Sequence, residues 1–219
     1  MQGRIITIAQ QKGGSGKTTL SAQLAGVWSK TRKNAKVAIL DVDPQGSLGE
    51  WFEAREQALG EDETGLTFRT ASGWGARREA RALSRDHDLV VVDTPPKSDS
   101  DARPAIEAGH MVAVPVQPSP VDLWATRSTL QLAEKEERAA ILVLNRVPPR
   151  AALTGEMLEA MAAFDNKISK TRLGNRVAFA ASMGQGLTVL ETAPASKATA
   201  EMTNLAKELH RALARTGDI

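Results

Sequence analysis

Residues 12–19 of the chain read KGGSGKTT and place two lysines around a stretch of glycines. Glycine lacks a Cβ atom, so the backbone N–H groups of such a loop can turn toward a phosphate without a clash. Lys17 supplies a positive charge for the β- and γ-phosphates of a nucleotide, and the hydroxyl group of Thr18 can ligate Mg²⁺. We therefore expect a nucleotide-phosphate site that comprises Gly13, Gly14, Ser15, Gly16, Lys17, Thr18 and Thr19.

The loop departs from the usual phosphate-loop pattern at its first position. That pattern places a glycine where this chain has Gln11, and an additional lysine, Lys12, follows. In a single chain, Lys12 would bring a second cation close to Lys17, so the spacing alone leaves the role of Lys12 open. The alternative is a glycine-rich turn with incidental lysines, which the preceding strand pattern and the following helix pattern disfavour.

Three aspartates follow apolar runs that predict buried strands. Because side chains alternate along a strand, Asp41 and Asp43 are expected to face one crevice, where two carboxylates need a cation nearby. Asp93 occupies the position at which phosphate-loop proteins hold an acid near Mg²⁺. The expected metal site therefore comprises Thr18, Asp41, Asp43 and Asp93. The alternative for Asp41 and Asp43 is a strand-end turn in which an aspartate caps a helix.

Short apolar runs alternate with helical patterns along the chain, which predicts a parallel sheet flanked by helices. Strands are expected at 4–9, 36–40, 66–70, 89–92, 111–116 and 140–144, with a weaker one at 171–173. Helices are expected at 17–32, 47–59, 75–85, 99–108, 120–137, 154–164 and 197–215. We infer a single doubly wound α/β domain over residues 1–219, with a mostly parallel sheet and a ligand crevice at the carboxyl ends of its strands.

The composition excludes several classes of protein. The chain of 219 residues contains no cysteine, which rules out disulfides and cysteine-ligated iron–sulfur clusters, and no tyrosine, which rules out a kinase that phosphorylates its own tyrosines. No apolar run approaches the length of a membrane span, and the N-terminus does not resemble a signal peptide. We expect a cytoplasmic protein.

The KGGSGKTT motif resembles the deviant Walker A motif of the ParA/MinD family of P-loop ATPases. The segments DVDPQG at 41–46 and DTPP at 93–96 resemble the switch I and switch II segments of that family. The resemblance implies ATP and Mg²⁺ as cofactors and a homodimer that sandwiches the nucleotides. It also implies catalytic roles for three residues: Lys12 reaches the phosphates of the partner subunit, Lys17 binds those of its own subunit, and Asp43 positions or activates the attacking water.

Two further segments carry the resemblance. In relatives an asparagine at the end of a later strand contacts adenine, which implies that Asn145, with Arg146 beside it, recognises the base; the alternative is a polar strand end without a ligand. The segment 114–124 resembles one near the dimer interface of short, ParF-like partition ATPases. Trp124 is therefore expected to be a core or interface anchor.

We expect no helix-turn-helix domain before the phosphate loop, so the resemblance is closest to short, ParF-like ParA proteins. It implies binding to nucleoid DNA without sequence preference and stimulation of hydrolysis by an adaptor protein, so that a plasmid, a chromosome locus or a protein compartment is positioned. Residues 140–219 carry ten basic and seven acidic side chains, whereas residues 1–139 carry 18 basic and 19 acidic ones. The DNA-contact candidates therefore lie in the C-terminal part: Lys170, Arg172, Lys197 and Arg211.

Two alternative functions remain open at the level of sequence. The first is a membrane-cycling regulator of the MinD type, but the apolar stripe of Met202, Leu205, Leu209 and Leu213 is expected to pack on the sheet rather than on lipid, so no stable membrane anchoring is expected. The second is a metabolic ligase of the dethiobiotin-synthetase type, which shares the phosphate loop but has no need of Lys12.

Overall fold

The computed structural model describes residues 2–96, 99–149, 153–164 and 166–217, which form a seven-stranded sheet in the order β3-β2-β4-β1-β5-β6-β7. The strands are β1 (Arg4–Ile8), β2 (Val37–Asp41), β3 (Thr67–Thr70), β4 (Leu89–Asp93), β5 (Met111–Val116), β6 (Ala139–Leu144) and β7 (Lys167–Ile168). Each neighbouring pair of strands is parallel. The predicted doubly wound α/β fold is confirmed.

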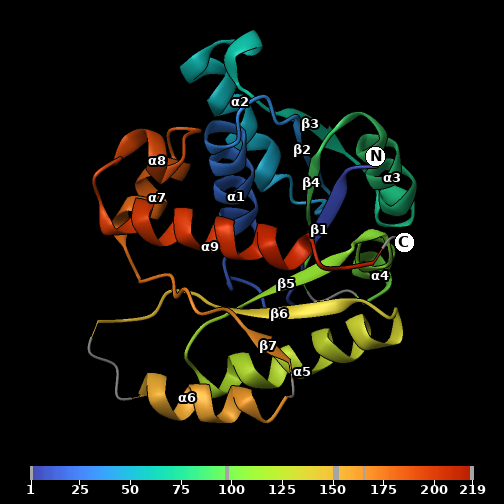
Figure 1. The fold of residues 1–219 in the computed structure, drawn as a ribbon, viewed down its shortest axis with the longest axis vertical. Coiled ribbons are helices and arrows are strands. Elements are labelled where there is room, and N and C mark those ends of the chain that lie inside the picture. The colour runs from blue at the N-terminus through green and yellow to red at the C-terminus, as the bar shows by residue number, and fades with distance from the viewer. Residues whose placement is uncertain (1, 97–98, 150–152, 165, 218–219) are drawn as a thin grey trace.

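Helices cover both faces of this sheet (Figure 1). They are α1 (Lys17–Thr31), α2 (Ser47–Leu59), α3 (Ala76–Asp86), α4 (Asp99–Ala108), α5 (Pro120–Lys135), α6 (Leu153–Ala162), α7 (Val177–Met183), α8 (Val189–Thr192) and α9 (Lys197–Leu213), with 3₁₀ turns η1 (Glu61–Glu63) and η2 (Gly73–Gly75). Helices α1, α2, α8 and α9 bury their apolar residues on one face, and α3 to α6 bury theirs on the other. The alternation is visible in β1, where Ile6 and Ile8 enter the first core and Ile5 the second.

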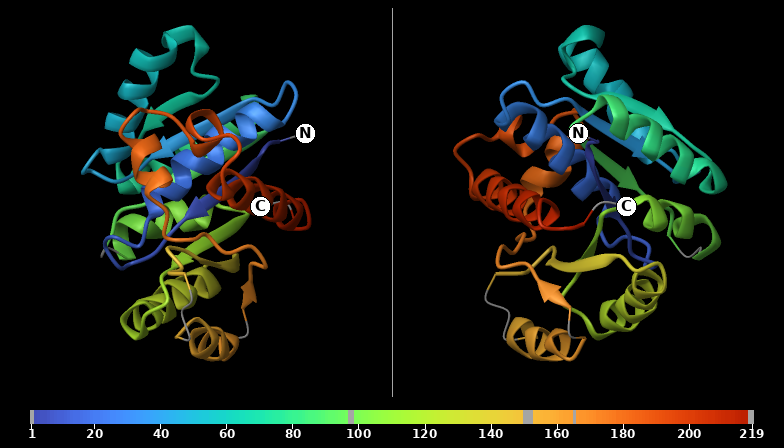
Figure 2. Two further views of the ribbon diagram at one scale, coloured as in Figure 1. Left: turned by 90° about the vertical axis from the view of Figure 1, so that its left-hand side faces the viewer. Right: turned by 45° about the vertical axis from the view of Figure 1, so that its right-hand side comes forward.

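The apolar stripe of α9 packs on the sheet, as the sequence predicts. Met202, Leu205, Leu209 and Leu213 are all fully buried and belong to the core formed with α1. The helix lies along one side of the molecule beside α1 (Figure 1 and Figure 2). Within the described residues, no helix combines the length and the apolar character that crossing a bilayer requires.

Three elements of the C-terminal third differ from the prediction. The last strand is the two-residue β7 at Lys167–Ile168, not the predicted segment 171–173, because the ladder with β6 pairs Ile141 with Lys167 and Leu142 with Ile168. The segment 171–173 then leaves the ladder, although the N–H of Leu173 still donates to the carbonyl of Leu144 at 2.9 Å. Helices α7 and α8 were not predicted.

Candidate functional site

The phosphate loop connects the carboxyl end of β1 to the first turn of α1. Gly16, the residue before the helix, has φ 93° and ψ 25°, a left-handed conformation that favours glycine. A Cβ atom at this position would lie 2.4 Å from Nδ2 of Asn145. That amide nitrogen donates to the carbonyl of Ser15 at 2.9 Å, so Asn145, at the end of β6, fastens the loop. Lys17 follows as the first helical residue.

Lys17 is held among carboxylates at the helix N-terminus. Its side chain is largely buried, and this burial lowers the pKa of Lys17, while the negative charges of Asp93 and then Asp43 act in the opposite direction. The ammonium group therefore has counter-charges in its own chain. Because backbone N–H groups of the first helical turn are also unpaired, this end of α1 favours an anion such as a phosphate.

Asp93 ends β4 beneath the loop and is fully buried. Its Oδ2 accepts a hydrogen bond from Oγ1 of Thr18 at 2.7 Å, and its Oδ1 accepts one from Oγ of Ser21 at 2.9 Å. The pKa of Asp93 is raised to about 7, and burial is the largest cause. The charge of Asp41 also raises this pKa, whereas the hydrogen bonds from Thr18 and Ser21 lower it. A nearby cation would favour the ionised carboxylate.

Asp41 and Asp43 lie at the end of β2 beside this group. Oδ1 of Asp41 accepts from the backbone N–H of Asp43 at 2.9 Å, and burial raises the pKa of Asp41. Oδ2 of Asp41 and Oγ of Ser15 are buried without a hydrogen-bond partner among the described residues. Both atoms lie in the loop-and-strand region that the sequence assigns to a nucleotide, so they fit a polar ligand that completes the site.

The acidic residues do not form a metal site by themselves. In the described ranges, no group of three or more acidic or histidine side chains is arranged to hold a metal ion. The arrangement fits Mg²⁺, which commonly keeps its waters and binds through one or two protein ligands together with substrate phosphates.

Lys12 has an acidic partner within its own chain, in a distant part of the sequence. Its Nζ lies 2.5 Å from Oδ2 of Asp122 in the first turn of α5. The Asp122 side chain is fully buried, and that of Lys12 is 33% exposed. Ser119, the N-cap residue of α5, also donates to the same carboxylate. Lys12 and Lys17 therefore have separate counter-charges, and the predicted crowding of two cations is relieved by Asp122, which the sequence analysis did not single out.

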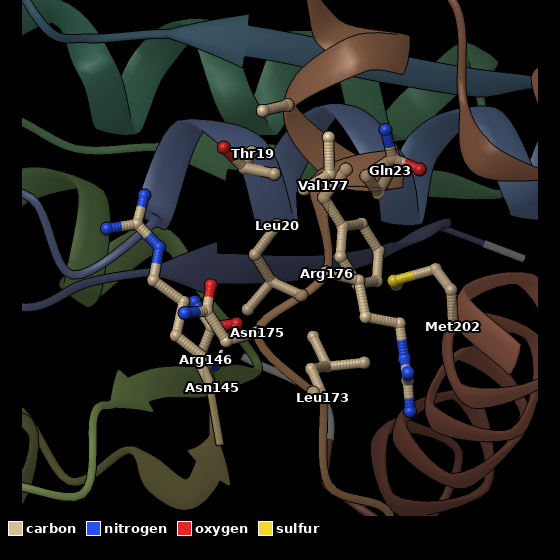
Figure 3. Close-up of a pocket in the computed structure, with 13 residues that line it drawn as sticks. Thr19, Leu20, Gln23, Asn145, Arg146, Leu173, Asn175, Arg176, Val177 and Met202 are labelled. Atoms are coloured by element: carbon tan, nitrogen blue, oxygen red, sulfur yellow. Dashed lines mark hydrogen bonds between the residues drawn. The ribbon is translucent and has the colours of Figure 1, made fainter. Parts of the chain in front are cut away.

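A cavity of about 340 Å³ opens beside the loop (Figure 3). Figure 3 shows side chains from α1, from the end of β6, from the segment before α7, from the start of α7 and from α9 converging on it, among them Leu20, Leu173 and Val177. Arg176 turns away toward α9, where its Nε donates to Glu201 at 2.9 Å. Asn145 and Arg146 line the end of the cavity that is nearest the loop, because Arg146 donates to the carbonyl of Gly14 at 3.1 Å. The cavity therefore continues directly from the phosphate loop.

Comparison with known sequence families identifies the family of the chain. The family described as the CobQ/CobB/MinD/ParA nucleotide binding domain matches residues 6–189. The chain belongs to this family. The match begins in β1 and ends in α8, so it includes the phosphate loop, the three aspartates and Asn145.

Several curated relatives of this ParA/MinD-family chain match it along nearly its whole length. The maintenance of carboxysome distribution protein A of Gloeobacter kilaueensis is 33% identical over 95% of this chain and 94% of its own. The protein of the same name from Halothiobacillus neapolitanus is 28% identical over 91% and 92%. The chromosome-partitioning ATPase Soj of Thermus thermophilus is 28% identical over 94% and 95%.

Solved structures of other proteins share the fold of this chain. The Pyrococcus furiosus cell division ATPase MinD superposes with a TM-score of 0.80 at 21% identity, covering 96% of this chain and 99% of that one. A Cyanothece McdA–ATP complex gives a TM-score of 0.77 at 17% identity, covering 100% and 99%. At these identities the likeness concerns the arrangement of helices and strands.

The remaining predicted residues lie outside the loop. The four DNA-contact candidates are exposed, with Lys197 and Arg211 on α9 and Lys170 and Arg172 between β7 and α7. Trp124 is 72% exposed on α5, so the prediction of a core anchor is wrong and that of an interface anchor stays a prediction. The sequence analysis missed Asp122 and the wall of the cavity before α7, because neither forms a contiguous motif.

Proposed function

We propose that the protein is an ATPase that dimerises when it binds ATP and positions a cargo on DNA. The observation that carries this proposal is Lys12. It is a second lysine on a phosphate loop whose own lysine, Lys17, already lies beside Asp93 and Asp43. Its side chain is 33% exposed at the mouth of the site, held by Asp122, and so it can turn toward a phosphate bound by a second copy of the chain.

The nucleotide phosphates bind at the loop and the N-terminus of α1, and the base enters the cavity beside Asn145. The loop N–H groups and Lys17 bind the phosphates. Thr18, which donates a hydrogen bond to Asp93, would hold Mg²⁺ together with Asp41. Mg²⁺ supplies positive charge that neutralises the phosphate oxygens. Asp43, partly exposed at the mouth of the site, orients the attacking water.

Dimerisation moves Lys12 from Asp122 to the phosphates of the partner subunit. An ion pair with a buried carboxylate is exchanged for contacts with a more highly charged group, so nucleotide with a γ-phosphate favours the dimer over ADP. Release of the phosphate after hydrolysis returns Lys12 to Asp122. The chain thereby acts as a nucleotide-controlled switch.

The cargo that the relatives favour is a protein compartment. Two of the matched relatives are named for maintaining carboxysome distribution, and a third is named a chromosome-partitioning ATPase. By analogy, the ATP-bound dimer binds nucleoid DNA without sequence preference, and an adaptor protein on the cargo stimulates hydrolysis and release.

The proposal is tested by measuring binding to non-specific duplex DNA with ATP, with ADP and without nucleotide. We expect tight binding only with ATP. A ligase of the dethiobiotin-synthetase type would show no gain with ATP, and a MinD-type regulator would show its gain on anionic lipid vesicles instead. Equal DNA binding with ATP and ADP would contradict the proposal.

Two substitutions test the assigned residues. Lys12→Ala should abolish ATP-dependent dimerisation in light scattering while nucleotide binding remains, and Lys33→Ala, which removes an exposed lysine after α1, should have no effect.

Asp43→Ala should slow hydrolysis and so accumulate the ATP-bound dimer. A Lys12→Ala variant that dimerises normally, or unchanged turnover in Asp43→Ala, would remove that residue from its role.

A further inference from the structure

Helix α3 carries an outward arginine face that neither the nucleotide site nor the C-terminal candidates include. Arg77, Arg78, Arg81 and Arg85 make up this arginine face. At 100° per residue, the four positions fall within an arc of about 100° and extend over about 12 Å of helix. The opposite side of α3 buries Ala76, Ala80 and Leu83 against the sheet. The arrangement therefore directs the guanidinium groups outward.

An exposed tryptophan lies at the N-terminal end of the arginine face. Trp74, in η2 directly before α3, is 86% exposed. A groove of about 350 Å³ is lined by Trp74 and the four arginines. Tryptophan is enriched at binding interfaces, where its ring provides apolar contact area and its N–H a polar end. Here the groove combines positive charge with one aromatic ring.

Only one of the four arginines on this face is paired with a carboxylate among the described residues. Arg77 pairs with Glu107 of α4 at 2.6 Å, whereas the side chains of Arg78, Arg81 and Arg85 have no ion-pair or hydrogen-bond partner among the described residues. The nearby acidic residues are Glu79 and Asp86 on α3 itself and Asp101 and Glu107 on α4. Three unpaired guanidinium groups on one face favour an anionic partner of extended shape.

We propose that the arginine face, with Trp74, is the surface that binds the DNA backbone. Arginines one turn apart are separated by about 6 Å along the helix. Successive guanidinium groups can therefore contact different phosphates of one strand, which carries one charge per about 3.4 Å of duplex axis. The guanidinium groups donate to phosphate oxygens, and the indole ring packs on deoxyribose. This inference rests on the proposed function and names the surface that performs its DNA-binding step.

The geometry of α3 favours DNA over a membrane. A helix that lies on lipid presents its apolar side to the bilayer, but the apolar side of α3 is buried in the core. Lys197 and Arg211, two of the C-terminal candidates, lie on α9, which covers the other face of the sheet. An ATP-bound dimer carries two arginine faces, so dimerisation raises the affinity for one long duplex through avidity.

The test compares two variants in which the same number of positive charges is removed. One combines Arg78→Ala, Arg81→Ala and Arg85→Ala, and the matched control combines Lys170→Ala, Lys197→Ala and Arg211→Ala. Alanine is a strong helix former, so both chains are expected to fold, which thermal melts verify. Neither set touches the nucleotide site, so dimerisation and unstimulated hydrolysis should remain unchanged. Binding of a labelled random-sequence duplex is measured with ATP between about 50 and 200 mM salt.

We expect the α3 variant to bind DNA on the order of tenfold more weakly at low salt. Its salt slope should be smaller by about three for each arginine face that contacts the duplex, and so by up to about six for a dimer that uses both faces, because each removed arginine leaves one phosphate without its cation. The control should change much less. The inference is overturned if the α3 variant binds DNA like the wild type, or if its weakened binding appears on anionic phosphatidylglycerol vesicles and not on DNA. If the wild type itself binds no DNA with ATP, the proposed function is overturned as well. If the wild type binds DNA and the α3 variant binds equally well, only the assignment of the surface is overturned.

Discussion

At the scale of single residues, the ion pair between Lys12 and Asp122 opposes the proposed dimer. The carboxylate is fully buried, so withdrawal of Lys12 leaves a negative charge without its cation. Oδ1 of Asp122 already lacks a hydrogen-bond partner among the described residues, which increases that cost. The equilibrium between monomer and dimer therefore depends on Asp122 as well as on the nucleotide.

Asp122→Asn should strengthen ATP-dependent dimerisation. The amide keeps the size of the side chain but no longer holds Lys12 by charge, so we expect the dimer dissociation constant to fall several-fold, which corresponds to about 1 kcal/mol. Analytical ultracentrifugation with a non-hydrolysable ATP analogue measures it. The gain must vanish in the Lys12→Ala/Asp122→Asn double variant; an unchanged dissociation constant in the single variant would show that the pair does not restrain the dimer.

His210, in the last turn of α9, makes the stability sensitive to pH. Burial lowers its pKa below the ordinary value of 6.5, and the charge of Arg32, which its Nε2 contacts, lowers it further. Just below pH 6.5 the unfolded chain therefore binds a proton that the folded chain does not, so the free energy of unfolding falls as the pH falls through that window. Denaturant titrations at pH 7.5 and 5.5 should show a smaller decrease for His210→Gln than for the wild type.

At the scale of elements, Arg55 connects α2 to the short helix α8. Its guanidinium donates to both carboxylate oxygens of Glu191, at 3.0 and 2.9 Å, and to the carbonyls of Thr64 and Gly186. Burial alone would raise the pKa of Glu191, but the hydrogen bonds from Arg55 and Thr188 outweigh it and hold that pKa below its usual range. This network holds α8 and the turn before it in place.

Arg55→Ala should destabilise the fold by about 3–5 kcal/mol, because it leaves Glu191 without its buried partner. The matched control is Arg103→Ala: Arg103 is 53% exposed and pairs with Glu136, and we expect a loss below about 1 kcal/mol. Urea unfolding followed by circular dichroism measures both. Similar losses for the two variants would mean that burial does not set the strength of the Arg55 pair.

At the scale of the whole molecule, Trp124 and Val121 form an exposed apolar pair on α5. They are 72% and 53% exposed and belong to the same helix as Asp122, which holds Lys12. A dimer that brings Lys12 to the partner's phosphates would bring this part of α5 close to the second copy. The pair therefore fits the apolar centre of the proposed interface.

Trp124→Ala should weaken ATP-dependent dimerisation by on the order of tenfold, since aromatic anchors dominate such interfaces. Light scattering with ATP measures the loss. Trp74→Ala, which removes another highly exposed tryptophan, directly before α3, should leave dimerisation unchanged. Equal dimerisation of the Trp124→Ala variant and the wild type would place the interface elsewhere.

The long elements of the fold could be predicted because their signals are local. Strands β1, β2, β4 and β5 are largely apolar segments of five or six residues, as expected for strands buried on both faces. Helices α7 and α8 have seven and four residues, too few to show a periodic pattern. They exist because distant groups hold them: the side chain of Gln23 in α1 accepts from the N–H of Val189 at 2.9 Å.

The sequence by itself determined the phosphate loop, the strand-end aspartates and the membership of the family, because a glycine-rich turn and its lysine act within a few consecutive residues. The tertiary structure decided which groups surround them. It placed Asp122 on Lys12 from 110 residues away. It also buried the opposite side of α3, so that the four arginines of this helix face outward, within residues 1–139, whose charges nearly cancel. Such groupings depend on helix orientation and packing, which a charge count along the chain does not contain.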